Sequence, residues 1–150
     1  MTIYRAATTG DFDAIARIWI DGWLSNGIAL ASEPDYLTLR ARIDREVAGG
    51  WQIIVADQTG VVVGFVAMSP DKRVLEQIFI DPVSHRQGIG AGLLAQARAV
   101  MPQGFTLWTH GDNHGAAAFY EAMGMALVSA GMHPKNDHAI RTYRFGPLAA

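Results

Sequence analysis

The chain has 150 residues, half of them hydrophobic, which is the size and composition of one globular domain with a substantial core, over residues 1–150. A net charge of -2 with scattered basic residues gives no reason to expect a nucleic-acid partner, and the absence of cysteine excludes disulfides and thiol chemistry. No run of about 18 apolar residues and no apolar signal core occur, so we expect no membrane partner and a cytoplasmic location.

The first third of the sequence predicts one strand followed by two helices. Residues 3–6 have the pattern of a short strand. Thr8 and Asp11 stand at capping-box spacing and open a first helix. Ser32 and Pro34 mark the start of a second helix, which ends at a Gly-Gly pair.

Two tryptophans of the first helix, Trp19 and Trp23, stand four residues apart and therefore share one face. Such residues either pack in the core or line a ligand cleft, and the polar segment SNGIALASE follows directly. We take both as candidates for binding an acceptor with some hydrophobic body.

Three strands are expected next, at residues 51–56, 61–68 and 73–80, with short turns between them. Turns of this length join antiparallel neighbours, so the three strands form a meander. Gly64, inside the second of these strands, indicates a bulge or a close backbone approach.

The stretch IFIDPVSHRQGIGAGLL follows the third strand and organises the chain. A proline ends the strand, glycines fill the turn, and a helical apolar pattern begins at once, at Ile89, Leu93, Leu94, Ala97 and Val100. The glycines therefore lie at a helix N-terminus, where free N–H groups and the helix dipole favour an anion such as phosphate. Gly88 and Gly90 permit close approach and Arg86 adds a cation, although a tight turn alone also calls for glycine.

The last third predicts a strand at 105–109, a helix capped by Asn113 and ended by Gly124, and two strands at 125–130 and 139–145. The element order is therefore β-α-α-β-β-β-α-β-α-β-β. That order indicates an α+β domain with a mixed sheet.

Two blocks of the sequence resemble the GNAT superfamily of acyl-CoA-dependent N-acyltransferases. QIFIDPVSHRQGIGAGLL is similar to the family's CoA-binding segment, and NHGAAAFYEAMGM is similar to its Asn-x-x-Ala-x-x-Phe-Tyr block. The resemblance implies a mostly antiparallel mixed sheet with a central parallel pair that splays apart. It also implies acetyl-CoA as co-substrate, no metal, and a homodimer. His85 departs from the family's usual Gln or Arg, and Met125 from its usual aromatic residue.

The same resemblance implies roles for particular positions. The main chain of the strand would hydrogen-bond the acetyl carbonyl and the pantetheine arm through Ile78, Phe79 and Ile80. The pyrophosphate would be wrapped by six consecutive residues, Arg86, Gln87, Gly88, Ile89, Gly90 and Ala91. Asn113 would bind the pantetheine side, and Tyr120 would lie near the thioester sulfur as the catalytic acid.

Glu76 is the candidate catalytic base. Alternation along the strand predicts that it shares a face with Ile78 and Ile80, close to the expected carbonyl. The alternative is a solvated glutamate on the exposed side of the sheet.

The histidines do not have the pattern of a metal site. His110 and His114 stand four residues apart, but a glycine and no glutamate follows the first, so we expect a loop position and a helix start. His133 and His138 flank a polar loop that would cover the acceptor, and we take His133 as an acceptor-binding candidate.

These features together predict an N-acetyltransferase that moves the acetyl group of acetyl-CoA to a primary amine of a small or amino-acid-like molecule, by direct attack in a ternary complex. Two alternatives stay open: acetylation of a protein N-terminus or lysine, and a sensor module that binds acyl-CoA without catalysis. A nicotinamide-dependent oxidoreductase is disfavoured because the turn lacks G-x-G-x-x-G.

Overall fold

The computed structural model describes residues 1–25, 35–132 and 139–146, and its elements follow the predicted order. They are β1 (Thr2–Ala6), α1 (Phe12–Ser25), α2 (Tyr36–Ala48), β2 (Gln52–Gln58), β3 (Val61–Ser69), β4 (Val74–Ile80), α3 (Ile89–Val100), β5 (Phe105–His110), α4 (His114–Ala122), β6 (Ala126–Met132) and β7 (Ala139–Phe145).

One seven-stranded sheet runs in the order β1-β2-β3-β4-β5-β7-β6. Neighbouring strands are antiparallel except β4 and β5, which are parallel and share a single registered pair, Val74 with Thr106. The Thr106 N–H also donates to the Arg73 carbonyl at 3.0 Å. Beyond this point the two strands separate, which confirms the predicted mixed α+β sheet with a central parallel pair that splays apart.

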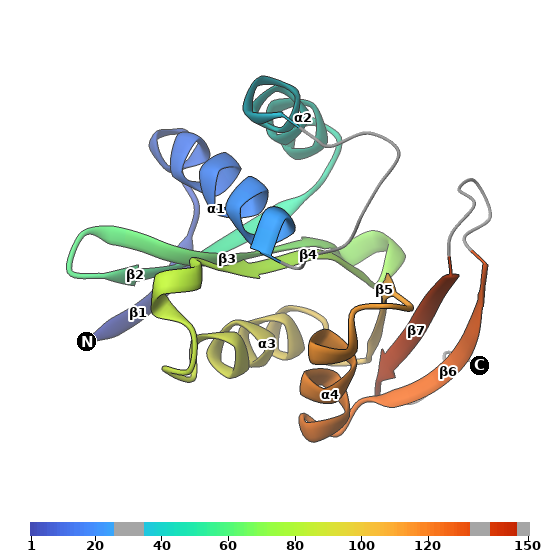
Figure 1. The fold of residues 1–150 in the computed structure, drawn as a ribbon. Helices are drawn as coiled ribbons and strands as arrows, with labels where there is room; N and C mark the ends of the chain where they lie inside the picture. Colours follow the sequence, from blue (N-terminus) through green and yellow to red (C-terminus); the bar gives the residue numbers. More distant parts are fainter. Residues whose placement is uncertain (26–34, 133–138, 147–150) are drawn as a thin grey trace.

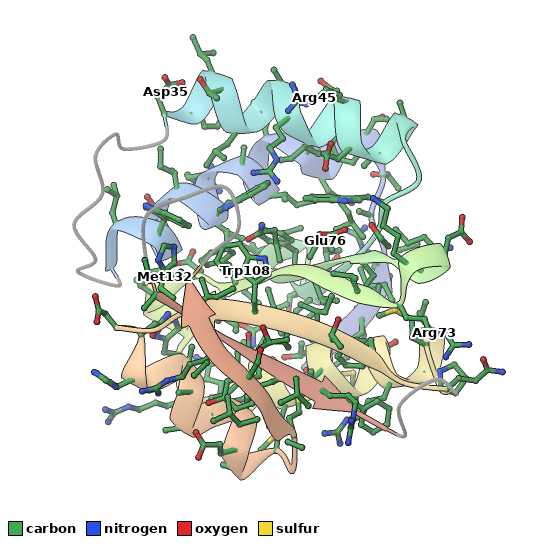
Figure 2. All side chains as sticks on the ribbon, turned by 90° about the vertical axis from the view of Figure 1, so that its right-hand side faces the viewer. Asp35, Arg45, Arg73, Glu76, Trp108 and Met132 are labelled. Carbon is green, nitrogen blue, oxygen red and sulfur yellow. The ribbon has the colours of Figure 1, made fainter. Side chains whose placement is uncertain are left out.

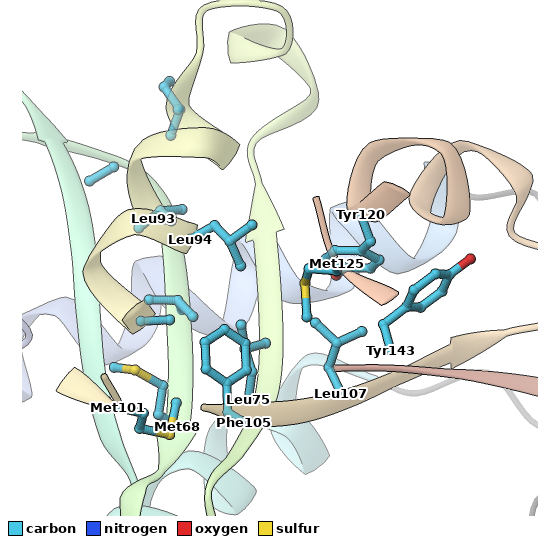
Figure 3. Close-up of a cluster of buried hydrophobic side chains, with 14 of the residues drawn as sticks. Met68, Leu75, Leu93, Leu94, Met101, Phe105, Leu107, Tyr120, Met125 and Tyr143 are labelled. Atoms are coloured by element: carbon cyan, nitrogen blue, oxygen red, sulfur yellow. The ribbon is translucent and has the colours of Figure 1, made fainter. Parts of the chain in front are cut away.

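Two helical layers cover the sheet: α1 and α2 lie over one face, and α3 and α4 lie over the other (Figure 1). The side chains of β3 alternate between two cores, since Phe65 and Ala67 face α1 whereas Val66 and Met68 face α3. This strand is buried on both faces and is correspondingly apolar along its length. Figure 3 shows the core on the α3 side.

Gly64 of β3 confirms the predicted close approach. A Cβ atom built on it would lie 3.2 Å from Leu93 of α3 and 3.3 Å from Ile89. The helix that follows the central turn is therefore held tightly against the sheet.

The helix starts have identifiable caps. The Thr8 N–H donates to the Asp11 carboxylate at 2.7 Å, and a short 3₁₀ turn then leads into α1 at Phe12. Helix α2 begins at Tyr36 and not earlier, because Asp35 is its N-cap and accepts the N–H of Thr38 at 2.8 Å. Ser32 and Pro34, the predicted start signals, lie outside the described residues.

An ion-pair cluster ties the N-terminal strand to its neighbours. The Arg5 guanidinium contacts Asp11 at 2.7 Å and Asp57 of β2 at 3.0 Å. Hydrogen bonds from Arg5 lower the pKa of the Asp11 carboxyl to about 2, against the opposing effect of its burial. Arg5 thus joins β1, the first cap and β2.

A β-bulge interrupts the pairing of β3 with β4. Ala67 pairs with Gln77 and Met68 with Leu75, so Glu76 is the extra residue on β4. Leu75 and Ile78 consequently both face the α3 core although they are three residues apart. Strict alternation would place Glu76 on the same face of the sheet as Ile78. Because of the bulge, Glu76 lies on the opposite face, toward α1.

The outer strands β7 and β6 extend beyond α1 and α2 (Figure 1). β6 is an edge strand and all seven of its residues are exposed. Among the described helices, none is long and apolar enough to cross a bilayer.

Candidate active site

A cavity of about 860 Å³ occupies the gap where β4 and β5 separate. It draws on both helical layers, because its wall includes the end of α1 on one side of the sheet and α3 and α4 on the other. Its lining comprises residues 22–23, 75–80, 84–86, 88–91, 107–110, 113, 115, 116, 119, 120 and 123. The cavity therefore passes through the sheet.

One end of the cavity is formed by the turn between β4 and α3. Asp81 closes the strand by accepting the N–H of Val83 at 3.2 Å. Gly88 then adopts φ +78°, a left-handed conformation that favours glycine, and serves as the N-cap of α3. The first N–H groups of this helix have no intrahelical acceptor and favour an anion. A Cβ on Gly90 would lie 3.2 Å from the Phe119 ring, so the backbone here is closely packed.

The polar side chains of this turn have different surroundings. Arg86, in a left-handed conformation at φ +67°, lines the cavity. His85 also lines it, and its Nε2 lies 3.2 Å from the Ile80 carbonyl oxygen, so the ring fastens the turn to the strand. The Gln87 side chain accepts a hydrogen bond from Gln58 at 3.0 Å and does not line the cavity, which leaves its main chain for a ligand role.

The main chain of β4 offers alternate residues to the gap. The Asp81 N–H donates to the Val63 carbonyl on β3 at 2.8 Å. Because main-chain directions alternate along a strand, Phe79 also points its N–H and carbonyl toward β3. Only Ile78 and Ile80 point theirs into the gap. The expectation that Phe79 offers its main chain to a ligand is therefore wrong, although its side chain lines the cavity.

Helix α4 forms a second wall of the cavity. Asn113 is its N-cap, as predicted, and its Oδ1 accepts the Ala116 N–H at 3.1 Å. The amide nitrogen of Asn113 is not used in this cap. Because Asn113 also lines the cavity, that nitrogen can serve a ligand.

Tyr120 projects from α4 into the wall of the cavity and is only 6% exposed. In Figure 3 it lies beside Met125 and Leu107, and its ring centroid is 5.7 Å from that of Tyr143. Burial raises the pKa of the Tyr120 hydroxyl, because the phenolate would lose its hydration. A protonated phenol at this place is suited to act as an acid.

Tyr143, which the sequence did not single out, supports this wall. It is fully buried, and its hydroxyl donates to the Glu121 carboxylate of α4 at 2.8 Å. The only available signal was its position in a strand of alternating pattern, which is common to many core residues.

Glu76 lines the cavity from the α1 side of the sheet. The prediction that it shares a face with Ile78 and Ile80 is wrong, because the bulge described above makes Glu76 the unpaired residue. Its carboxylate accepts a 2.6 Å hydrogen bond from the Ser69 hydroxyl, and Ser69 is itself buried. Sequence reasoning missed Ser69, which orients the carboxylate.

The two tryptophans of α1 lie in different surroundings. Trp19 is 2% exposed, lies 6.5 Å from Phe79 in a stacked arrangement, and does not line the cavity. Its predicted contact with an acceptor is therefore wrong, since its face of α1 packs on β3 and β4. Trp23, one turn further, does line the cavity.

His110 was expected on a surface loop but is the last residue of β5 and lines the cavity with Trp108. His114 begins α4, as predicted. His133 and His138 lie outside the described residues. Within the described ranges, no group of three or more His, Asp or Glu side chains is placed to hold a metal ion.

Comparison with known proteins identifies the kind of domain that has this architecture. The model of the acetyltransferase (GNAT) family matches residues 12–125. A mycothiol acetyltransferase of Beutenbergia cavernae is 29% identical over 118 residues, which are 77% of this chain and 38% of that protein. This chain thus spans well under half the length of that relative.

Solved structures share the whole fold at low sequence identity. The putative acetyltransferase yncA of Salmonella typhimurium, solved with acetyl-CoA, has a TM-score of 0.74 at 17% identity and covers 100% of this chain and 97% of its own. A GNAT acetyltransferase of Bacillus cereus has a TM-score of 0.76 at 18% identity, with 99% of each chain covered.

Proposed function

Because this chain belongs to the GNAT family of acetyltransferases, we propose that it transfers the acetyl group of acetyl-CoA to a primary amine of a small molecule, by direct attack within a ternary complex. The observation that carries this proposal is the cavity through the sheet. It joins an anion-binding turn on one side to a carboxylate on the other, with a protonated tyrosine in its wall.

The residues of the turn fit the phosphates of acetyl-CoA. The N–H groups at the start of α3 and the Arg86 cation provide complementary donors, as they do for pyrophosphate at other helix N-termini. Nothing lies within 4 Å of a Cβ atom built on Gly88, so the backbone there is open to close approach. Acetyl-CoA supplies an acyl group that is already activated as a thioester, so no covalent enzyme intermediate is needed.

The N–H groups of β4 that face the gap position the acetyl end. The N–H of Ile78 points into the gap, where it can donate to the carbonyl oxygen as negative charge develops there. Ile80 contributes a second main-chain donor toward the pantetheine arm. Asn113 offers its amide nitrogen from the opposite wall.

Two side chains move protons. Glu76 accepts the proton that the amine loses as its nitrogen bonds to the acetyl carbon, either directly or through a water molecule. Tyr120 donates a proton to the sulfur as the carbon–sulfur bond breaks. The place of Tyr120 in the wall of the cavity supports this assignment.

A small-molecule acceptor fits the named activity of the mycothiol acetyltransferase relative. A protein N-terminus or lysine as acceptor, and a sensor that does not catalyse transfer, are the alternatives that the experiment below separates. We place the enzyme in the cytoplasm, where acetyl-CoA is used.

We further propose a homodimer formed through the outer strands. β6 is an edge strand whose backbone is open to a partner, and it exposes Leu127, Val128 and Met132 at 51%, 43% and 58%. Size-exclusion chromatography with light scattering tests this, and a monomer at micromolar concentration would contradict it.

The test of function is release of free CoA thiol from acetyl-CoA in the presence of amines, amino acids, polyamines and short peptides. Transfer to small amines supports the proposal, and Tyr120→Phe should then lower kcat about 10²-fold, the size of one lost acid. Transfer to peptides alone would indicate a protein acceptor. No transfer, with acetyl-CoA still raising the Tm, would indicate a sensor.

A further inference from the structure

Three ring side chains meet on the α1 side of the cavity, where neither the family motifs nor the comparisons assign a role. Trp108 and His110 are alternate residues of β5 and therefore share a face, opposite to the buried Phe105 and Leu107. The His110 ring centroid lies 5.7 Å from Trp108 and 5.4 Å from Trp23 of α1, and both contacts are T-shaped. We call Trp23, Trp108 and His110 the aromatic wall.

Glu76 belongs to the same side of the sheet. It follows Val74 by two residues, and Trp108 stands two residues beyond Thr106, the partner of Val74 in the only registered pair of these parallel strands. The two side chains thus start at the same level of the gap, and both line the cavity. Figure 2 shows Glu76 and Trp108 on the side of the sheet that faces α1 and α2.

The charges of the cavity are separated along its length. Among its described lining residues, Glu76 and Arg86 carry full charges. Glu76 precedes Ile80 by four strand residues, or roughly 13 Å at the rise of a β-strand, and Arg86 lies beyond Ile80 in the turn. The acceptor end is therefore aromatic and anionic, whereas the CoA end is cationic.

We propose, on the basis of the function proposed above, that the acceptor is a primary amine carried on an aromatic or similarly flat apolar body and without a carboxylate beside the amine. The aromatic wall binds the body by ring contacts and attracts the ammonium group. Glu76 pairs with that ammonium and repels an acceptor carboxylate. Trp108, which is 44% exposed, becomes covered when the acceptor binds.

The experiment measures kcat/KM for matched acceptors with saturating acetyl-CoA. Tryptamine and 2-phenylethylamine are compared with tryptophan and phenylalanine, which add only the carboxylate, and with butylamine, which lacks the ring. We expect the arylalkylamines to exceed both other groups about ten-fold or more, the size of one or two ring contacts or one charge repulsion.

Variants of the aromatic wall test whether these residues cause the preference for arylalkylamines. Trp108→Leu and Trp23→Leu should each raise the KM for arylalkylamines about five-fold, with the KM for acetyl-CoA unchanged, whereas Trp108→Phe should restore most of the loss. Leu37→Ala on α2, which shortens an apolar side chain that is 77% exposed and does not line the cavity, is the control.

Equal or better use of butylamine, tryptophan or phenylalanine would overturn this inference while leaving the acetyltransferase function intact. The same holds if Trp108→Leu weakens all acceptors equally. Failure of acetyl-CoA to raise the Tm of the wild-type protein would instead overturn the proposed function, and the acceptor assignment with it.

Discussion

The two ends of the cavity are lined by different kinds of groups. The end proposed to bind CoA consists mainly of main-chain groups from one continuous segment, namely a strand end, a glycine turn and a helix start, with the side chains of Arg86 and Asn113 beside them. The acceptor end consists of side chains from α1, β4 and β5, which are far apart in the sequence. An end made of backbone is specified by local sequence, whereas an end made of side chains depends on strand register and on the packing of distant elements.

Glu76→Gln should show the largest difference between the two ends, with a large effect on kcat and none on acetyl-CoA binding. This change removes the proposed base but keeps the shape and the Ser69 contact, so kcat should fall about 10²- to 10³-fold at neutral pH with the Kd of acetyl-CoA unchanged. The deficit should shrink as pH rises, because the acceptor amine then loses its proton in solution. A pH–rate profile of unchanged shape would remove Glu76 from the mechanism.

Gly90→Val tests the CoA end. Its first added carbon would lie 3.2 Å from Phe119 and 3.4 Å from Ile80, both of which line the cavity, so the wall there must shift and we expect acetyl-CoA to bind at least about ten-fold more weakly. Isothermal titration measures the Kd. Gly131→Val on β6, where nothing lies within 4 Å of an added Cβ, is the control and should bind normally. Equal Kd values in both variants would contradict the assignment of this turn.

Ser69→Ala should have a smaller effect, confined to the acceptor end. Loss of the 2.6 Å hydrogen bond leaves the Glu76 carboxylate less well oriented, so kcat should fall roughly three- to ten-fold. The acid limb of the pH–rate profile should move to higher pH, and Ser69→Thr should restore it. A change in stability without any change in the profile would show that Ser69 is only structural.

Asp11→Asn should affect neither end. Because the pKa of Asp11 is lowered to about 2, its ionised form stabilises the fold fully above about pH 4 and the contribution is lost as pH falls toward 2. We expect a loss of roughly 2 kcal/mol in the free energy of unfolding at pH 7. Urea unfolding measures this, with kcat/KM as the control. An unchanged unfolding free energy would contradict the ion-pair account.

The sequence predicted the local structure of the turn between β4 and α3, because neighbouring residues determine that structure. Proline, glycines and an apolar helical pattern determine a strand end, a turn and a helix start within a few residues, and the structure places Gly88 at the N-cap of α3. It predicted the acceptor end poorly. The bulge that displaces Glu76 leaves no mark in the pattern, because Glu76 and Gln77 are both polar and either could be the extra residue.

Two further misses have the same origin. Trp19 and Trp23 are equivalent by helical spacing, and only the position of α1 on the sheet buries the first and leaves the second at the cavity. His110 was placed in a loop because a glycine follows it, yet pairing with Ile140 of β7 extends the strand by one residue. Tertiary context, which no single segment contains, decides each case.

The lone registered pair between β4 and β5 also has a mechanical meaning. With Val74 and Thr106 as their one registered pair, β4 and β5 join two half-sheets at a single point, and we expect acetyl-CoA lying in the gap to take the place of a missing strand. Amide hydrogen exchange at Ile78 should therefore slow when acetyl-CoA is bound, whereas exchange in the β2–β3 pair should not change. On the function proposed above, the substrate completes the sheet.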